Sequence, residues 1–245
     1  MSMRVGLFVT CLGDLVYPGV GVATVTLLRR LGVDVVFPES QGCCGQMHIN
    51  SGFADQAVPL VRSFVDAFAD CDVIVAPSGS CVGSIRHQHQ MVASRSGDPT
   101  LAERVSSTVP RVRELTEFLV DDLGVTDVGA RFPHRVAYHP SCHSLRVARV
   151  GDRPYQLLRA VRDLELVEQR DAEGCCGFGG TFSVKNSAVS GAILEEKTAS
   201  LTDSGAEYVT SLDAACLMHV GGGFAKQGNA IRTVHLAEIL AGTVD

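Results

Sequence analysis

Two adjacent cysteine pairs, each set between glycines, constrain the fold of this 245-residue chain more than any other feature. Neighbouring side chains point to opposite faces of a strand and lie about 100° apart on a helix, so neither regular element directs two adjacent thiols to one point. Flanking glycines free the backbone to turn both sulfurs the same way. The sequence therefore predicts two specialised loops, SQGCCGQ at residues 40–46 and EGCCGFGG at residues 173–180.

The spacing of the other cysteines indicates an internal repeat. Cys11 precedes the first pair by 31 intervening residues and Cys81 follows it after 36; Cys142 and Cys216 bracket the second pair at 32 and 39. The surroundings match as well: RVGLFVTC with RVAYHPSC, DVIVAPSGSC with EYVTSLDAAC, and VRELTEFL with TVHLAEIL. We therefore predict a duplicated cysteine-rich unit, with a first repeat over 1–122, a linker over 123–133 and a second repeat over 134–245.

Within each repeat, short apolar runs alternate with longer amphipathic ones, which is typical of a parallel sheet flanked by helices. The fold class expected is α/β, with two tandem pseudo-symmetric repeats. Strands are expected at 4–9, 33–37, 72–76, 134–138, 164–167 and 206–210. Helices are expected at 19–31, 52–68, from about 80, at 153–162 and 187–203, and in the closing strings VRELTEFL and TVHLAEIL. Because sites in such sheets form beyond the carboxyl ends of the strands, the four cysteines of each half should meet at one edge.

Composition excludes several classes of function. A net charge of −6, with Lys and Arg scattered, argues against a basic nucleic-acid-binding face. The chain has no apolar stretch near the roughly 18 residues of a membrane span. It begins with a strand-like run, RVGLFV, rather than a signal peptide, so a cytoplasmic location is expected and a disulfide scaffold is not.

Four thiolates drawn from separate loops can hold zinc or an iron–sulfur cluster. Neither half contains the Cys-x-x-Cys knuckle of structural zinc sites, and adjacent cysteines suit a cofactor with several metal atoms better than one zinc ion. Iron–sulfur is therefore favoured. A zinc-stabilised interaction module and a metal-free thiol–disulfide oxidoreductase with a low-pKa cysteine remain alternatives.

Longer stretches carry a resemblance to a known family. The repeated C-x31-CC-x36-C pattern resembles the CCG cysteine-rich domain of heterodisulfide reductase, and of the iron–sulfur subunits of glycolate oxidase and anaerobic glycerol-3-phosphate dehydrogenase. TCLGDLVYPGVG, GCCGQMHINSG, YHPSCHSLR, CCGFGGTFSVKN, CLMHVGGG and HLAEILA look like the lactate utilisation protein A family, and the similarity runs from about residue 4 to residue 242.

The resemblance implies an iron–sulfur electron-transfer subunit of a cytoplasmic L-lactate (2-hydroxy acid) oxidation complex. Lactate would be converted to pyruvate together with partner subunits, including a ferredoxin-like iron–sulfur protein. Two [4Fe–4S]-type sites are implied, one per repeat, with the ligands Cys11, Cys43, Cys44 and Cys81, and Cys142, Cys175, Cys176 and Cys216. No catalytic residue is assigned, because no nucleophile triad, paired-carboxylate motif or flavin-binding pattern is present.

The chain departs from the fullest form of that family, in which each half ends in Cys-x-x-Cys. Ser78 and Asp213 stand three residues before Cys81 and Cys216, and the other possible register would place Ser84 and His219 instead. Each half keeps four thiolates, enough for one cubane cluster. An aspartate beside the second site is expected to lower its reduction potential relative to the first.

Several other residues have both an ordinary and a functional interpretation. Cys71 has no counterpart in the second half, where Gly205 stands, and is expected to be a small core residue. Hydrogen bonding to cluster sulfur is as plausible as an ordinary surface role for His48, His139 and His143. His219 is a weak candidate ligand, and His87 and His89 are expected on an exposed helix. Lys185 and Asn186 could bind a carboxylate or a partner, or simply start a helix. The glycines of GFGG (177–180) fit close backbone approach to a cluster better than nucleotide binding.

Overall fold

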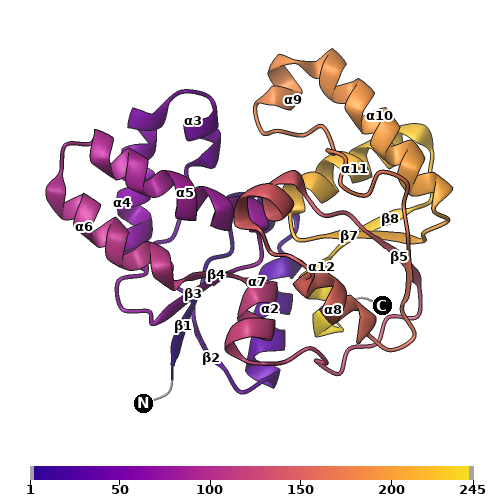
Figure 1. Cartoon of the computed structure of the whole chain (residues 1–245), viewed down its shortest axis with the longest axis horizontal. Helices are drawn as coiled ribbons and strands as arrows, with labels where there is room; N and C mark the ends of the chain where they lie inside the picture. The colour runs from indigo at the N-terminus through magenta and orange to yellow at the C-terminus, as the bar shows by residue number, and fades with distance from the viewer. Residues whose placement is uncertain (1–2, 243–245) are drawn as a thin grey trace.

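Two parallel sheets with the same strand order form the framework (Figure 1). A computed structural model describes residues 3–242, and within them the sheets are ordered β2-β1-β3-β4 and β6-β5-β7-β8. The first contains β1 (Arg4–Leu7), β2 (Asp34–Val36), β3 (Val73–Ala76) and β4 (Val112–Glu114); the second contains β5 (Arg135–Tyr138), β6 (Glu165–Val167), β7 (Tyr208–Ser211) and β8 (Arg232–His235). All neighbouring strands are parallel. The expected α/β class and tandem arrangement are confirmed.

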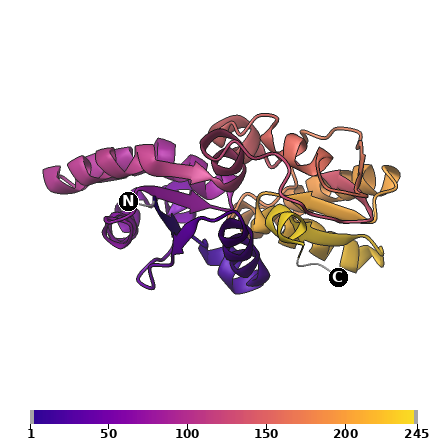
Figure 2. The ribbon, with the colours of Figure 1, turned by 90° about the horizontal axis from the view of Figure 1, so that it is seen from below.

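Helices flank both sheets (Figure 2). In the first half they are α1 (Cys11–Val16), α2 (Gly19–Arg30), α3 (Gln46–Asn50), α4 (Val58–Ala67), α5 (Gly79–Arg95), α6 (Pro99–Thr108) and α7 (Leu115–Glu117). In the second they are α8 (Arg153–Arg159), α9 (Phe182–Lys185), α10 (Ser187–Asp203), α11 (Ala214–Gln227) and α12 (Leu236–Ala241). Short 3₁₀ turns occupy η1 (Ala54–Ala57) and η2 (Val109–Arg111), and π-helical turns occupy η3 (Phe118–Asp122) and η4 (Ser144–Ala148).

The closing strings differ from the expectation of a helix. Each begins as the fourth strand of its sheet, β4 or β8, and turns into a short helix. A reciprocal capping box makes the turn: Glu117 accepts from the Glu114 N–H, and Glu238 accepts from the His235 N–H. The helix expected over 52–68 starts later than expected, because the 3₁₀ turn η1 occupies Ala54–Ala57 and α4 begins at Val58.

One hydrophobic core joins the two halves. Val5, Leu7 and Leu27 of the first half belong to the same buried cluster as Val136 and Leu240 of the second. The expected linker adds Val128, Ala130 and Phe132 to that cluster. Helix α12 of the second half packs on α2 of the first. The linker segment is therefore part of the core that holds the two sheets together.

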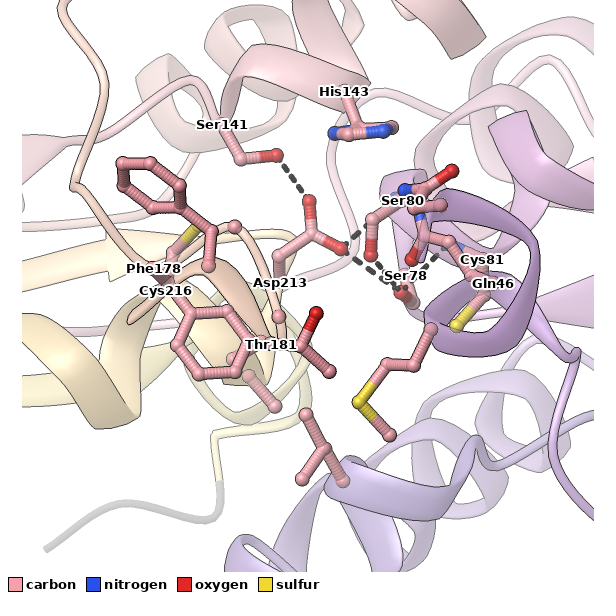
Figure 3. A pocket seen from close by; sticks show the side chains of 18 of the residues that line it. Gln46, Ser78, Ser80, Cys81, Ser141, His143, Phe178, Thr181, Asp213 and Cys216 are labelled. Atoms are coloured by element: carbon pink, nitrogen blue, oxygen red, sulfur yellow. Dashed lines mark hydrogen bonds between the residues drawn. The ribbon is translucent and has the colours of Figure 1, made fainter. Parts of the chain in front are cut away.

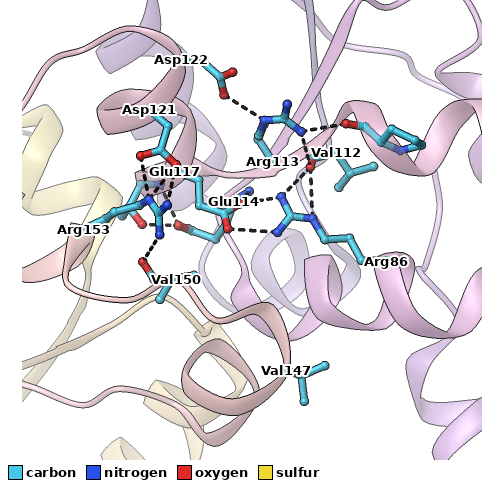
Figure 4. A network of polar contacts seen from close by, with 12 residues as sticks. Arg86, Val112, Arg113, Glu114, Glu117, Asp121, Asp122, Val147, Val150 and Arg153 are labelled. Atoms are coloured by element: carbon cyan, nitrogen blue, oxygen red, sulfur yellow. Dashed lines mark hydrogen bonds and ion pairs between the residues drawn. The ribbon is translucent and has the colours of Figure 1, made fainter.

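Ion pairs reinforce this junction (Figure 4). Arg153, at the start of α8, contacts Asp121 of the first half at 2.6 Å. Arg86 of α5 contacts Glu117 at 2.6 Å and also donates to the Val112 carbonyl. The Arg153 pair joins the two halves, whereas the Arg86 contacts fix α5, which carries Cys81, to the closing turn of its own sheet.

Within residues 3–242, no helix is both long enough and apolar enough to cross a bilayer.

Candidate metal centres

The four paired cysteines of the first half converge from three segments. Cys11 begins α1 just beyond β1, Cys43 and Cys44 lie between β2 and α3, and Cys81 lies in the first turn of α5. The Cys11 and Cys43 sulfurs are 3.5 Å apart, and the Cys44 and Cys81 sulfurs are 3.4 Å apart. The convergence expected at the carboxyl edge of the sheet is therefore present.

The second half repeats the arrangement. Cys142 follows β5, Cys175 and Cys176 lie between β6 and α9, and Cys216 lies in the first turn of α11. The Cys176 and Cys216 sulfurs are 3.1 Å apart, and the Cys142 thiol hydrogen-bonds Cys175. All nine cysteines of the chain are free thiols.

The glycine after each cysteine pair explains the CCG pattern. Gly45 and Gly177 adopt φ values of +83° and +89°, where a side chain is disfavoured. In this conformation each glycine N–H donates to the first sulfur of its pair, at 3.4 Å to Cys43 and 3.3 Å to Cys175. A Cβ at Gly177 would also lie 2.7 Å from the carbonyl oxygen of Ser190. The glycines therefore allow both the turn and the backbone hydrogen bond to sulfur.

All eight paired cysteines line one cavity of about 410 Å³ between the halves. Figure 3 shows Cys81 and Cys216 on opposite sides of it, with Asp213 between them. The two sets come together because η4 of the second half packs against α5 of the first, and α1 packs against α11. The contact between η4 and α5 requires Gly79, where a Cβ would overlap Ser144.

Hydrogen bonding within each set favours one thiolate. In the first half, donation from the Cys11 and Cys44 thiols lowers the pKa of Cys43 far below the usual thiol range, against the effect of burial. Neighbouring thiols lower the pKa of Cys175 in the same way. In each set the neighbouring S–H donors therefore favour the anionic form of one sulfur, and the thiolate is the form that binds metal or acts as a nucleophile.

The donor chemistry fits an iron–sulfur centre. Each half supplies four uncombined thiol sulfurs beside a cavity, and soft sulfur is the ligand of iron–sulfur clusters and of zinc. In the second half a nitrogen of His139 and the sulfurs of Cys176 and Cys216 all lie within 4.8 Å of one another. These residues can hold a multi-iron cofactor, and they can also hold a single zinc ion.

The two residues that replace the missing cysteines are bonded to each other across the halves. Ser78 and Asp213 are the N-caps of α5 and α11, and the Ser78 hydroxyl donates to Asp213 at 2.9 Å. Asp213 also accepts from the Ser80 N–H and the Ser144 hydroxyl, each at 2.9 Å, and from the Ser141 hydroxyl. Burial acts to raise the pKa of Asp213, but hydrogen bonds from serine donors, Ser141 first, hold it below its usual value. A buried carboxylate therefore lies between the two sets.

The sequence predicted that both His87 and His89 lie exposed on a helix, and this is right for only one of them. His87 is exposed, but His89 is fully buried, so the exposed-helix interpretation of His89 is wrong. His89 lies beneath α4 against the Phe64 ring, and its Nε2 is 2.8 Å from the Cys44 carbonyl oxygen. Burial lowers the pKa of His89 to about 4, so its ring is neutral.

The other histidines near the cysteines have distinct surroundings. His143 Nδ1 is 3.6 Å from the Cys142 sulfur, whereas His48 is exposed on α3. His219 is 3.3 Å from the Ser190 hydroxyl and its ring contacts Phe178. His219 therefore has a side-chain partner other than a cysteine.

The remaining predicted residues lie as follows. Cys71 is buried beside Phe68 and Gly6 in the apolar core and does not line the cavity. Lys185 and Asn186 line the mouth of the cavity, and the Lys185 ammonium lies 6.0 Å over the Phe53 ring. Gly179 and Gly180 line the cavity and have positive φ, and their close approach to a cluster stays a prediction.

Sequence inspection missed Lys197, a buried cation in the second half. Its ammonium donates to Gln169 at 3.1 Å and to the carbonyls of Asp171 and Ala172 at 2.8 and 3.1 Å. Its side chain is 3% exposed, and burial lowers its pKa. Lys197 lies within a predicted amphipathic helix, but only the fold of the distant loop before Cys175 encloses it, so no local pattern identifies it.

Known proteins match both the site and the whole chain. The CCG cysteine-rich domain family matches residues 5–86 and 136–221, which contain all eight paired cysteines. Lactate utilization protein A of Geobacillus kaustophilus is 45% identical over 238 residues, covering 97% of this chain and 98% of that protein. The protein of the same name from Oceanobacillus iheyensis is 42% identical over 238 residues, covering 97% of this chain and 96% of that one.

A solved structure shares the fold at low sequence identity. The crystal structure of a hypothetical protein from Helicobacter pylori superposes with a TM-score of 0.64 at 10% identity, covering 99% of this chain and 49% of that chain. That likeness concerns the fold alone, whereas the sequence matches extend to the cysteines. The chain belongs to the CCG cysteine-rich domain family and, within it, to the family of lactate utilization protein A.

Proposed function

We propose that this protein is an iron–sulfur electron-transfer subunit of an L-lactate oxidation system. The observation that carries the proposal is the duplicated set of four free thiols around one cavity. Support for the substrate class comes from relatives named lactate utilization protein A. Since this chain has no identified catalytic constellation, lactate would be oxidised to pyruvate at a site in a partner subunit.

Each half would hold one [4Fe–4S]-type cluster through its own cysteines. The ligands proposed are Cys11, Cys43, Cys44 and Cys81 in the first half, and Cys142, Cys175, Cys176 and Cys216 in the second. A bound cluster supplies one-electron redox chemistry. The chain contributes thiolate ligands, N–H donation to sulfur from Gly45 and Gly177, and a shared cavity that brings two redox centres near each other.

The proposed setting is cytoplasmic, in a complex with other subunits of the lactate system. A ferredoxin-like iron–sulfur protein is the expected redox partner. The two sets, one from each repeat, would then accept electrons from one partner and pass them to another.

Anaerobic purification followed by counts of iron and acid-labile sulfide tests the proposal. The expected protein is brown, absorbs broadly near 400 nm, and after reconstitution contains about eight iron atoms per chain. Stoichiometric zinc with less than one iron per chain would support the zinc-stabilised module instead.

A second candidate function rests on the close approach of free thiols, at 3.5 Å between Cys11 and Cys43, where hydrogen bonding also lowers the pKa of Cys43. A thiolate beside other thiols is the arrangement of a thiol–disulfide oxidoreductase. In that case the purified protein would be colourless and free of metal. Mild oxidation would form reversible disulfides such as Cys43–Cys44 or Cys11–Cys43, detectable by mass spectrometry after alkylation.

A further inference from the structure

His139 occupies a position that distinguishes the second cysteine set from the first. It lies three residues before Cys142, directly after β5, and is 1% exposed. The equivalent residue before Cys11 is Phe8, which is fully buried and packs edge-on against Phe64 at 5.2 Å. The first half therefore fills this position with a hydrocarbon ring, and the second half fills it with an imidazole.

The His139 ring has two unpaired nitrogens. Neither Nδ1 nor Nε2 has a hydrogen-bond partner among residues 3–242, although both are buried. A buried polar atom without a partner costs about 1–3 kcal/mol, so an otherwise apolar position would favour the phenylalanine of the first half. A neutral imidazole has a nitrogen lone pair that can bind a metal ion.

The nitrogen is directed at the sulfur donors. One His139 nitrogen lies within 4.8 Å of the sulfurs of both Cys176 and Cys216, which are themselves 3.1 Å apart. Imidazole nitrogen and thiolate sulfur are compatible ligands of iron and of zinc.

A buried histidine in the first half serves as an internal contrast. His89 lies on α5 eight residues after Cys81, and the same position after Cys216 on α11 is Phe224. The Nε2 of His89 is already bonded to the Cys44 carbonyl, at 2.8 Å. The two halves thus exchange histidine and phenylalanine at two equivalent positions, and the exchange leaves the imidazole with both nitrogens unpaired in the second half.

We propose that His139 is a nitrogen ligand of the metal centre in the second half, whereas the centre in the first half is bound by cysteine sulfur alone. The identity of that metal centre as iron–sulfur rests on the proposed function above. Replacement of thiolate by imidazole raises cluster potentials in known proteins, so ligation by His139 in place of one cysteine sulfur should make the second centre easier to reduce than a thiolate-only one.

The experiment uses the full chain with Cys44→Ser, which isolates the second site, reconstituted anaerobically with iron and sulfide. Pulsed EPR of the reduced protein is compared between natural-abundance and ¹⁵N-histidine samples. We expect a directly coordinated nitrogen coupling that disappears in His139→Phe, the residue that the first half itself uses at this position. The reduction potential of the second centre should fall in the same variant.

Matched controls separate His139 from its neighbours. His143→Asn removes the ring beside Cys142, and His89→Phe removes the other buried ring; both should retain the nitrogen coupling and the potential. If His139→Phe does not fold, survival of the isotope-sensitive coupling in His143→Asn, His89→Phe and His219→Asn still assigns the nitrogen to His139.

The outcomes distinguish the two proposals. Full iron and sulfide content without a coordinated nitrogen in the labelled protein overturns the assignment of His139 and leaves the proposed function intact. A potential shift in His139→Phe without that coupling would make His139 a hydrogen-bond donor to sulfur, which also overturns ligation. Failure to retain iron overturns the proposed function, and the inference with it.

Discussion

The two halves share a frame and a cysteine set but surround those cysteines differently. In the first, the Val9 N–H donates to the Gln41 side-chain oxygen at 2.9 Å. In the second, Pro140 stands at the equivalent position and has no N–H to donate, and the oxygen of the corresponding glutamine, Gln169, accepts from buried Lys197 instead. The glutamine oxygen therefore accepts from a backbone N–H in the first half and from a lysine ammonium in the second.

This difference bears on which charged and polar groups influence the reduction potentials of the two sites. The sequence suggested that Asp213 would distinguish them by lowering the potential of the second. The carboxylate accepts from Ser80, the neighbour of Cys81, and from Ser141, the neighbour of Cys142, so it lies between the two sets, and its effect on the second site stays a prediction. His139 and Lys197 also distinguish the halves, and if the proposals above hold, both should make the second centre easier to reduce. Duplication has produced two similar sets of ligands with different electrostatic surroundings.

The largest expected effect comes from removing one thiolate in each half. Cys44→Ser should abolish the first centre and Cys176→Ser the second, because the sulfurs of each set are contributed by one repeat and hydroxyl oxygen is a poor replacement for soft thiolate. Each variant should retain about half the iron and sulfide of the wild-type protein, measured after anaerobic reconstitution. If either substitution removed both centres from a folded chain, the two-site arrangement would be wrong.

Contacts that form within one repeat could be predicted from the sequence, whereas contacts between helices or between repeats could not. Convergence of the cysteines was predictable, since parallel strands place their carboxyl ends at one edge and the apolar runs locate those strands. The burial of His89 was not, because it depends on α4 packing over α5. The shared core and the bond between Ser78 and Asp213 were also hidden, since they depend on docking of one repeat against the other. Local sequence patterns predict the strands and cysteine sites within each repeat, but they do not predict the interface between the two repeats.

Asp213→Ala should weaken the junction between the halves by about 2–4 kcal/mol in the free energy of unfolding. The substitution leaves the buried donors on Ser78, Ser80 and Ser144 without their common acceptor. Ser78→Ala, the equivalent N-cap of the first half, removes one of those donors and should cost about 1 kcal/mol. Denaturant unfolding of the metal-free protein measures both. An equal effect of the two variants would show that Asp213 is no more than another helix cap.

The caps of the two closing helices should give opposite pH dependences of stability. Burial raises the pKa of Glu114 to about 8, so its stabilising contribution is complete below its unfolded pKa, near 4.5, and is lost as pH rises through 8. Burial lowers the pKa of His235 to about 4, so its contribution is complete above its unfolded pKa, near 6.5, and is lost as pH falls through 4. His235 Nδ1 accepts from the Ala237 N–H, and protonation there would remove this cap.

Unfolding free energies measured from about pH 3.5 to about pH 9 test this contrast. Glu114→Gln keeps a side-chain oxygen as acceptor and should flatten the decline toward alkaline pH, which runs from about pH 4.5 to 8 and is worth up to about 1.4 kcal/mol per pH unit for one proton. His235→Asn should reduce the loss on the acid side, where His89 and His139, also buried and neutral, continue to contribute. An unchanged alkaline slope in Glu114→Gln would assign that slope to other groups.

Lys197→Met should lower the reduction potential of the second centre and leave the first unchanged. It removes a buried positive charge that attracts Cys175, Cys176 and Cys216 while keeping a chain of similar length. Redox titration in the Cys44→Ser background isolates the affected centre. Lys226→Met, on the exposed surface of α11 in the same half, is the control and should leave the potential unchanged. Equal shifts in the two variants would mean that net charge, rather than burial near the sulfurs, controls the potential.

The smallest expected effect concerns the ninth cysteine, which is also a difference between the halves. The Cys71 sulfur fills the space left by Gly6, where a Cβ would lie 2.6 Å from it. The second half has Ala137 at the position equivalent to Gly6 and Gly205 near the position equivalent to Cys71, so the missing volume is supplied from the strand. Cys71→Ser should therefore reduce stability by about 1–2 kcal/mol, because it buries a hydroxyl among apolar groups, and should leave iron and sulfide content unchanged. Cys71→Ala separates the effect of polarity from that of lost volume, and metal analysis of both variants decides the matter: loss of a centre in either would place Cys71 among the ligands of the first half.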